Sequence, residues 1–431
     1  MKNITKKILV LLLTLVVIIG TVFSLSSCSI LDFVSDFIEE NTDENKDGSP
    51  SDSTTADPGA SDGGSSDKTE GASGTPGNTE GDPVEFYPGA GSVSADKISP
   101  KNRTLLSTVV IVANFGLSPS AGSGVIYSID REKGDAYIIT NYHVVYDRNY
   151  GACDSANLYL YGMRYSSYAI SAKLVGGSVE YDIAVLKVEG SEVLKNSYAM
   201  AADFGNSEDV RVFDDVFVVG NPEGFGMAVT EGIISVDSES LEMTGCDGSA
   251  IKLRVMRVSA AVNEGNSGGG LYDDGGKLIG VVCAKRVGSE VDNIAYAIPS
   301  NLAKNLVDNI IYFCDGGDKT TVQRPLIGIT ITSKVIGIVV DEETGDIVKA
   351  ELVEVTELTD TCIAKELIQV GDVVNSITVN GVTVKVTRLH HVIDHMLTAR
   401  VGSEVVLNVT RGGEIVEFSF TVPESAFSSV K

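Results

Sequence analysis

Short apolar runs rich in β-branched residues, separated by turn residues, recur along the chain from about residue 99 to its end. Such runs are typical of strands, and many of them in succession favour a barrel or a sandwich. The strands expected in the first β-rich region are 109–113, 125–129, 137–140, 158–161, 183–188, 216–219, 233–236 and 278–283. Turn signals at 133–135 and 273–276 separate neighbouring runs. The pattern predicts an all-β fold, with few helices.

Two segments show a helical period instead. After Pro299 and Ser300, apolar side chains at 302, 306, 310 and 311 fall on one face, which predicts a helix that closes the first region. A second β-rich region follows, with one expected helix at 389–397. The folded domains are therefore predicted at 99–315 and 324–425.

The N-terminus has the pattern of an export signal. Lysines at positions 2, 6 and 7 precede an apolar run over 8–22, and the small-residue stretch Leu25-Ser26-Ser27-Cys28 follows. The run is too short, and wrongly flanked, for a transmembrane helix. The final tetrapeptide resembles a bacterial lipobox, which implies a lipoprotein signal peptide at 1–27 and a lipid on Cys28. The alternative is an ordinary signal peptide that happens to contain a cysteine.

Residues 28–98 are rich in Ser, Gly, Asp, Thr and Pro and, after about residue 41, very poor in large apolar side chains. Such a composition buries too little surface to offset the entropy of ordering, so a disordered acidic tether is expected there. Between residues 29 and 100, 16 Asp and Glu stand against 3 Lys, which supplies half of the chain's net charge of −26. Because no basic stripe is present, a nucleic-acid partner is not expected.

Candidate chemistry lies at three points in the first region. His143 ends an apolar run, and no other histidine occurs before residue 390. Asp182 begins the apolar run 183–188, where an acidic residue is commonly a turn or cap residue. The segment 263–271 reads Asn-Glu-Gly-Asn-Ser-Gly-Gly-Gly-Leu and places Ser267 among glycines. Glycines let the backbone turn tightly, so that the hydroxyl is presented and N–H groups converge on a developing oxyanion.

The strings TNYHVV, YDIAVLKV, VVGNPEGF, EGIISV, NEGNSGGGL and AYAIPSNLAKNL occur in this order between residues 104 and 312. They resemble the HtrA branch of the chymotrypsin-fold serine proteases. The resemblance implies a chymotrypsin-like double β-barrel of two six-stranded barrels. It implies His143 as general base, Asp182 as its orienting partner and Ser267 as nucleophile. It also implies an oxyanion hole at Gly265, Asn266 and Ser267, in which the N–H groups of Gly265 and Ser267 donate.

Two positions depart from the family pattern. Glu264 stands where Pro or Arg is usual, and Gly270 where Pro or Ala is usual, which adds backbone freedom without removing a catalytic group. The fold further implies that Ala261, six residues before the nucleophile, forms the floor of the specificity pocket, with Val282 and Cys283 on its wall. Such a pocket is small and apolar, so cleavage after Val, Ala, Ile or Leu is expected.

The second region carries Arg-Pro-Leu-Ile-Gly-Ile at 324–329 and a Gly-Asp pair at 371–372. Their order resembles the PDZ domain that follows the protease in this family, with a Lys-Glu pair at 365–366 in place of the usual Ala-Gly pair. The resemblance implies a peptide-binding site at Leu326, Ile327, Gly328 and Ile329, where an extended peptide adds as a strand and its C-terminal carboxylate is captured. A generic β domain is the alternative.

Three histidines, His390, His391 and His395, fall on the helix expected at 389–397. Histidines at i and i+4 can bind one metal ion, but no third ligand is evident, so a solvated helix face is the expectation. The sequence requires no metal and no organic cofactor. The five cysteines other than Cys28 are odd in number and show no CxxC spacing, so no disulfide is predicted.

These features predict an ATP-independent serine-type endopeptidase that degrades unfolded or damaged polypeptides by acyl-enzyme chemistry. It is expected at the extracytoplasmic face of a bacterial cell membrane, anchored through Cys28, and the resemblance implies a homotrimer. Peptide C-termini are the expected partners of the PDZ-like domain. The main alternative is a peptide-binding sensor or holdase that keeps the protease fold as a scaffold. A cell-wall hydrolase would need paired-carboxylate signals, which we do not find in the sequence.

Overall fold

The structure is a computed structural model that describes residues 95–430, apart from 117, 154, 164–167, 225, 284–293, 341 and 343. The expected signal peptide, Cys28 and the expected tether up to residue 94 lie outside the described residues. Within those described ranges, no helix combines the length and apolar character needed to cross a bilayer. The described residues begin with η1 (Ala95–Lys97) and α3 (Pro100–Leu106), and the Ser99 hydroxyl caps the N-terminus of α3.

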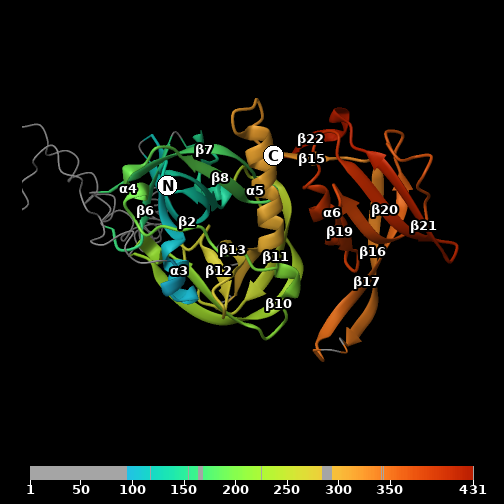
Figure 1. The fold of residues 1–431 in the computed structure, drawn as a ribbon, viewed down its shortest axis with the longest axis horizontal. Coiled ribbons are helices and arrows are strands. Elements are labelled where there is room, and N and C mark those ends of the chain that lie inside the picture. The colour runs from blue at the N-terminus through green and yellow to red at the C-terminus, as the bar shows by residue number, and fades with distance from the viewer. Residues whose placement is uncertain are drawn as a thin grey trace, which may run out of the picture. The chain divides into compact units, whose positions relative to one another are not determined.

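Six antiparallel strands close the first barrel in the order β1-β2-β3-β8-β7-β6 (Figure 1). Their bounds are β1 Thr108–Phe115, β2 Ser118–Asp130, β3 Asp135–Thr140, β6 Ser155–Leu160, β7 Ile170–Ser178 and β8 Ile183–Val188. Between them lie η2 Tyr142–Val144, β4 Tyr146–Asp147 and β5 Gly151–Ala152. The interior is filled by branched side chains such as Ile111, Ile126, Ile138 and Leu186, each at most 1% exposed.

The second barrel closes in the order β10-β11-β14-β13-β12-β9. Its strands are β9 Asp215–Gly220, β10 Ala228–Thr244, β11 Ala250–Val258, β12 Gly270–Asp273, β13 Leu278–Cys283 and β14 Ala295–Pro299. The elements that precede the barrel or connect its first strands are α4 Glu192–Lys195, η3 Ser207–Asp209 and η4 Pro222–Gly224. Because each barrel is closed, neither leaves an unpaired strand edge.

Helix α5 (Ser300–Cys314) packs against strands of both barrels, β7 and β8 of the first and β13 and β14 of the second (Figure 1). Its buried face carries Leu302, Leu306 and Ile310, at the helical spacing expected from the sequence. Two tyrosines of the first barrel donate hydrogen bonds to carboxylates at this helix, Tyr127 to Asp308 and Tyr137 to Asp315. The helix therefore ties the two barrels together.

The C-terminal domain follows α5. Five strands form a sheet in the order β16-β17-β18-β20-β21, with β19 paired to β18, while β15 pairs with β22. The bounds are β15 Val322–Pro325, β16 Ile329–Val340, β17 Ile347–Leu358, β18 Val373–Val379, β19 Val382–Lys385, β20 Glu404–Arg411, β21 Glu414–Thr421 and β22 Phe427–Val430. Helix α6 (Leu389–Met396) and η5 (Glu424–Ala426) complete it.

The mainly β fold with two six-stranded barrels is confirmed. Strand β8 has the bounds expected from its largely apolar run, and the two expected helices are α5 and α6. Strand β10 is much longer than the expected 233–236. Its partly exposed positions carry Asp, Ser and Glu, so a search for apolar runs finds only its most apolar part.

Candidate active site

The imidazole of His143 lies against the carboxylate of Asp182. His143 is in η2, directly after β3, and Asp182 directly precedes β8, which pairs with β3. Nδ1 of His143 lies 2.8 Å from Oδ2 and 3.0 Å from Oδ1 of Asp182, and the backbone N–H of His143 donates to Oδ1 at 3.1 Å. The Asp182 side chain is 3% exposed and the His143 side chain 20%. A buried carboxylate in this position holds the ring in the tautomer that leaves Nε2 free to accept a proton.

Asp182 has a left-handed backbone, with φ 49°. A non-glycine residue in this region costs on the order of 1 kcal/mol or more and persists only where its surroundings hold it. Here the side-chain amide of Asn141 donates to the Asp182 carbonyl at 3.0 Å, and the Asp182 N–H donates to Val179 at 3.3 Å. The turn before β8 is therefore shaped to aim the carboxylate at His143.

Ser267 lies in the loop between β11 and β12, beside strand β2 of the other barrel. The N–H of Ser123 donates to the Ser267 carbonyl at 2.8 Å. A methyl group on Gly122 would lie 2.7 Å from the Val144 side chain and 3.3 Å from the Ser267 carbonyl. Strand β2 therefore touches both the segment that holds His143 and the loop that holds Ser267. In the described part of the chain, Oγ of Ser267 makes no hydrogen bond to the imidazole of His143. Catalytic hydrogen bonds of this kind often shorten only when substrate binds.

Only glycine fits directly after Ser267. Gly268 has φ 83°, and a Cβ there would lie 2.2 Å from the Ser123 carbonyl and 2.4 Å from the Thr140 hydroxyl. The glycines around the serine therefore serve a close approach of two barrels as well as a tight turn.

The hydroxyl of Ser123 links the loop before Ser267 to the end of β9. It donates to the Gly265 carbonyl at 2.7 Å and accepts the Asn221 N–H at 2.9 Å, and the residue is fully buried. Sequence reasoning missed Ser123. The signal that could have found it is its position between two glycines, Gly122 and Gly124, directly before the apolar run Val125-Ile126-Tyr127.

The loop before Ser267 leaves two backbone donors available. Among the described residues, the N–H groups of Gly265 and Ser267 donate to no protein acceptor. The N–H of Asn266 donates to the Asn263 carbonyl at 3.1 Å, so Asn266 has no backbone donor to add to the two expected ones. Gly265 has φ 94°, and a side chain there would collide with the Asn221 carbonyl.

Sequence comparisons place this arrangement among known proteases. Residues 122–281, which include His143, Asp182 and Ser267, match the family described as "Trypsin-like peptidase domain". The chain is 33% identical over 260 residues to "Serine protease Do-like HtrA" of Bacillus subtilis, which covers 56% of this chain and 53% of that protein. This segment is a trypsin-like peptidase domain of the HtrA type. The chain spans about half the length of the curated relatives it matches.

Two further proteins resemble this chain. "Probable periplasmic serine endoprotease DegP-like" of Bartonella henselae is 33% identical over 327 residues, 73% of this chain and 55% of the relative. Among solved structures, "HtrA-type protease AlgW with tripeptide" is 26% identical with a TM-score of 0.49, and the match covers 75% of this chain and 95% of that chain.

Cys283 of the HtrA-type domain has a different place from the one expected. Its thiol lies 3.2 Å from Oδ2 of Asp182, and the residue is 2% exposed. The neighbouring residue Val282 packs in the core of the second barrel, because consecutive residues of β13 face opposite sides. Cys283 therefore contacts the Asp–His pair and does not form a pocket wall together with Val282. Ala261 is exposed, and residues 284–293, which follow Cys283, lie outside the described residues.

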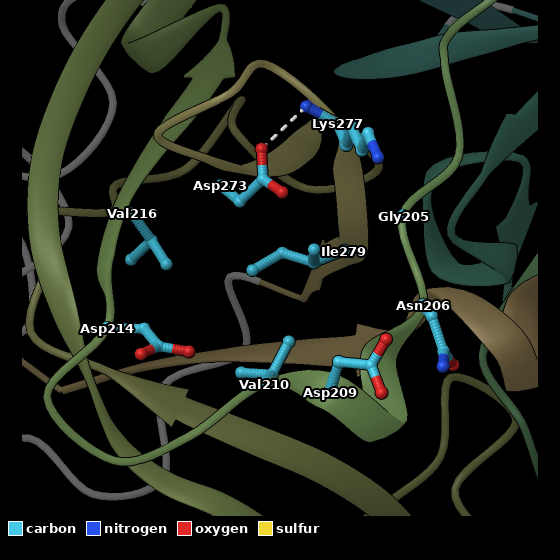
Figure 2. A pocket seen from close by; sticks show the side chains of 9 residues that line it. All are labelled: Gly205, Asn206, Asp209, Val210, Asp214, Val216, Asp273, Lys277 and Ile279. Atoms are coloured by element: carbon cyan, nitrogen blue, oxygen red, sulfur yellow. Dashed lines mark hydrogen bonds between the residues drawn. The ribbon is translucent and has the colours of Figure 1, made fainter. Parts of the chain in front are cut away.

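Figure 2 shows a pocket of the HtrA-type domain that is separate from these residues. It is lined by Gly205, Asn206, Asp209, Val210, Asp214, Val216, Asp273, Lys277 and Ile279. Two of its carboxylates hold turns: Asp214 accepts the N–H of Arg211 at 2.7 Å, and Asp273 accepts the N–H of Lys277 at 2.8 Å. These two carboxylates therefore already stabilise local backbone.

In the C-terminal domain, the four residues expected to bind a peptide precede or begin an edge strand. Strand β16 pairs only with β17, so its other edge is unpaired within the described sheet. Leu326 is 51% exposed and Ile327 6% exposed. The carbonyl of Gly328, which has φ 77°, accepts the Thr359 N–H at 2.9 Å, so the turn before β16 is fixed. Ile329 is the first residue of β16 and is partly buried.

The histidines of α6 do not form a solvated face, and that expectation is wrong. His395 is 7% exposed, and its Nε2 lies 2.9 Å from the Val382 carbonyl. Nε2 of His390 and of His391 lie 3.2 and 3.0 Å from Oε2 of Glu208, which belongs to η3 of the HtrA-type domain. The polar character of the helix serves a contact with another polar surface, which the sequence of α6 alone does not reveal.

Two sets of three described residues could hold a metal ion: His143, Asp182 and Cys283, and Glu208, His390 and His391. The first set is the hydrogen-bonded group already described. In the second, burial alone would raise the pKa of Glu208, but the hydrogen bonds from the two imidazoles and the nearby Arg254 outweigh it and hold that pKa below its usual range. Burial lowers the pKa of His390, and the hydrogen bond to Glu208 opposes this only in part.

Proposed function

We propose that the chain is an extracytoplasmic serine endopeptidase of the HtrA type, with Ser267, His143 and Asp182 as its catalytic triad. The observation that carries the proposal is the buried carboxylate of Asp182, 2.8 Å from Nδ1 of His143, next to a loop that presents Ser267 between left-handed glycines. All three residues lie in the segment 122–281 that matches a trypsin-like peptidase domain. Unfolded or damaged polypeptides are the proposed substrates.

In the proposed mechanism, Nε2 of His143 removes the proton from Oγ of Ser267 as this oxygen bonds to the scissile carbonyl carbon. Asp182 accepts a hydrogen bond from Nδ1–H of His143 and stabilises the imidazolium. The carbonyl oxygen becomes an oxyanion that accepts the N–H groups of Gly265 and Ser267, each donor contributing about 2.7 to 4 kcal/mol in the transition state. The C–N bond then breaks, and His143 gives its proton to the leaving amine. Water hydrolyses the acyl-enzyme with the same base.

The test uses the full chain with unfolded casein and a fluorophosphonate probe. We expect the probe to label Ser267 alone, and Ser267→Ala to lose both labelling and turnover, by a factor on the order of 10⁶ in kcat, while remaining folded. Ser249→Ala, which changes an exposed serine outside the site, is the control and should behave as the wild type. Casein cleavage by a clean preparation of Ser267→Ala would contradict the triad. A wild-type chain that binds casein without cleaving it would favour the scaffold alternative.

Specificity is proposed to follow from the small Ala261 at the pocket floor. No acidic group stands at position 261 to pair with a substrate Lys or Arg, and an unpaired charge in an apolar site is costly. We expect cleavage after Val, Ala, Ile or Leu with loose preference, since one methylene discriminates by only about 1 to 3 kcal/mol. New C-termini from a digested protein mixture, read by mass spectrometry, test this. A majority of Lys or Arg would show that the pocket is wrongly assigned.

The C-terminal domain is proposed to be PDZ-like and to bind peptide C-termini by strand addition along β16. The unpaired edge of that strand and the fixed turn at Gly328 support this. A peptide with a free C-terminus should bind at least about tenfold more tightly than its amide, because the amide lacks the carboxylate charge. Leu326→Glu should weaken binding, whereas Ile415→Glu, at an even more exposed apolar residue on β21, should not. Equal binding of acid and amide would refute the assignment.

The proposed location is the outer face of a bacterial cell membrane, with a lipid on Cys28. Cys28→Ala should move the protein from the membrane fraction to the soluble extracytoplasmic fraction, and unchanged membrane fractionation would refute the anchor. The soluble variant also allows light scattering to test the proposed homotrimer. A monomer mass at working concentrations would exclude it.

A further inference from the structure

We infer that Glu208, His390 and His391 form a zinc site that joins the HtrA-type domain to the C-terminal domain. The two imidazoles come from adjacent residues of α6, and the carboxylate comes from η3, 182 residues earlier for His390. The ligand atoms, Nε2, Nε2 and Oε2, all lie within 4.8 Å of one another. Two imidazole nitrogens and one carboxylate oxygen are a ligand set that zinc commonly takes, with water in the fourth position.

The distances fit a tetrahedral ion. With metal–ligand bonds of about 2.0 to 2.2 Å, ligand atoms on a tetrahedron lie roughly 3.3 Å apart. The Oε2–Nε2 distances of 3.2 Å to His390 and 3.0 Å to His391 are within a few tenths of an ångström of this value. The two Nε2 atoms lie within 4.8 Å of each other, so the imidazoles would rotate to bring the third distance to the same value.

The surroundings orient the ligands. Nδ1 of His391 has two backbone neighbours: it accepts the Thr387 N–H at 3.2 Å and lies 3.0 Å from the Lys385 carbonyl. Binding of the ion at Nε2 would place the ring proton on Nδ1, where the Lys385 carbonyl can accept it. The His390 ring packs edge to face on the His391 ring, with centroids 4.6 Å apart. The side chains of His390 and His391 are only 14% and 12% exposed, and that of Glu208 is 35% exposed. The pair of rings is thus held in place, while the carboxylate side stays open to an entering ion.

The charges also allow a cation. Arg254 lies 3.9 Å from Oε1 of Glu208, but it is paired with Asp394, so the group carries the negative charge of Glu208 when the imidazoles are neutral. Further contacts hold α6 against the HtrA-type domain: Asn305 donates to the Asp394 carbonyl at 2.9 Å, and Arg388 to Asp237 at 2.7 Å. A zinc ion here would add metal–ligand bonds between α6 and the HtrA-type domain, which are already in contact.

The experiment titrates the full, metal-free chain with Zn²⁺ by calorimetry and with Co²⁺ by visible absorption. We expect one ion per chain and the intense bands of tetrahedral Co²⁺. His391→Ala and Glu208→Gln should each weaken binding by at least about tenfold, since even the loss of an outer-shell partner costs about 10- to 100-fold. Asp209→Asn, which removes the adjacent carboxylate of η3, is the matched control and should bind as the wild type.

The variant His143→Ala tests whether Zn²⁺ binds instead at the Asp–His pair of the active site. We expect it to leave the titration unchanged. Circular dichroism shows which variants are folded, and if Glu208→Gln is not, His390→Gln replaces it. Zn²⁺ binding that survives loss of both α6 histidines, or a wild-type chain that binds no ion, would overturn the inference.

Discussion

The thiol of Cys283 and the carboxylate of Asp182 meet across the two barrels. Cys283 ends β13 of the second barrel, and its sulfur lies 3.2 Å from Oδ2 of Asp182, which precedes β8 of the first. The same oxygen faces Nδ1 of His143 at 2.8 Å. The orientation of the Asp–His pair therefore depends on a residue of the opposite barrel.

Cys283→Ala should lower kcat about tenfold. Hydrogen bonds to charged groups contribute about 1.5 to 3 kcal/mol, a thiol is a weak donor, and about 1.4 kcal/mol of lost transition-state stabilisation corresponds to a factor of ten. Cys283→Ser should restore most of the activity, because a hydroxyl donates to the same oxygen. Cys314→Ala changes another buried thiol of the same apolar cluster and is the control. Steady-state kinetics with a peptide substrate measure this, and wild-type kcat in Cys283→Ala would refute the role.

Ser123→Ala should lower activity more than its loss of stability explains. Removing the hydroxyl leaves the Gly265 carbonyl and the Asn221 N–H without their partner, at a cost of about 1 to 3 kcal/mol, and loosens the loop before Ser267. Ser300→Ala is matched, because the buried Ser300 hydroxyl also donates to a glycine carbonyl, that of Gly205, at 2.9 Å. Both variants should unfold at lower urea concentration. If both also lose turnover equally at a temperature where they are folded, Ser123 has no special role in the site.

Gly268→Ala should abolish activity and destabilise the HtrA-type domain strongly. Its Cβ would lie 2.2 Å from a backbone carbonyl, in addition to the strain of φ 83°. Gly116→Ala carries a similar φ of 65° with nothing within 4 Å, so it isolates the backbone strain, which should cost about 1 kcal/mol. Urea unfolding of both variants gives the difference. Equal losses of unfolding free energy would mean that the close approach of the barrels at Gly268 can relax.

Asp372→Asn should destabilise the C-terminal domain above about pH 4. The Asp372 side chain is 1% exposed. Its carboxylate accepts two hydrogen bonds from the Arg411 guanidinium, at 2.6 and 2.7 Å, and one from the Gln369 N–H at 2.8 Å. Burial opposes ionisation, but these bonds outweigh it and hold the pKa of Asp372 below its usual value. A lowered native pKa stabilises the fold above the unfolded pKa, about 3.9, and this stabilisation is lost as the pH falls through the native pKa.

At pH 7 the loss in unfolding free energy should be about 1.5 to 3 kcal/mol, and the difference from the wild type should shrink below about pH 4. Asp360→Asn, at a fully exposed carboxylate, is the control and should change stability little. A deficit of Asp372→Asn that stays constant from pH 7 to pH 3 would show that the charge of Asp372 is not what stabilises the domain.

The parts of the site that could be predicted are those encoded in contiguous residues. His143, Asp182 and Ser267 each stand in a short string whose neighbours shape the local backbone, as the glycines at 265 and 268 show. Strand β8 could be bounded because all of its residues except Lys187 are buried and apolar, on both faces.

The parts that could not be predicted depend on contacts between distant residues. Ser123 donates to a carbonyl 142 residues away, and Cys283 meets a carboxylate 101 residues away. Glu208 is one of many acids in the chain, and only the fold brings it to His390 and His391. Polar residues on α6 are equally compatible with a face exposed to water and with a face packed on another polar surface. Only the folded structure shows that α6 contacts a polar surface.

Because α5 packs against the first barrel but follows it by many residues, this barrel lacks the helix during part of the chain's synthesis. Tyr127 and Asp308 are 181 residues apart, and Tyr137 and Asp315 are 178 residues apart. All six strands of the first barrel leave the ribosome long before the helix that covers β7 and β8 exists. During that interval the apolar surface of β7 and β8 that α5 later covers is exposed to solvent. Exposed apolar surfaces of this kind favour aggregation. A nascent chain stalled before residue 300 should therefore need an export chaperone, whereas one stalled well beyond residue 315 should not.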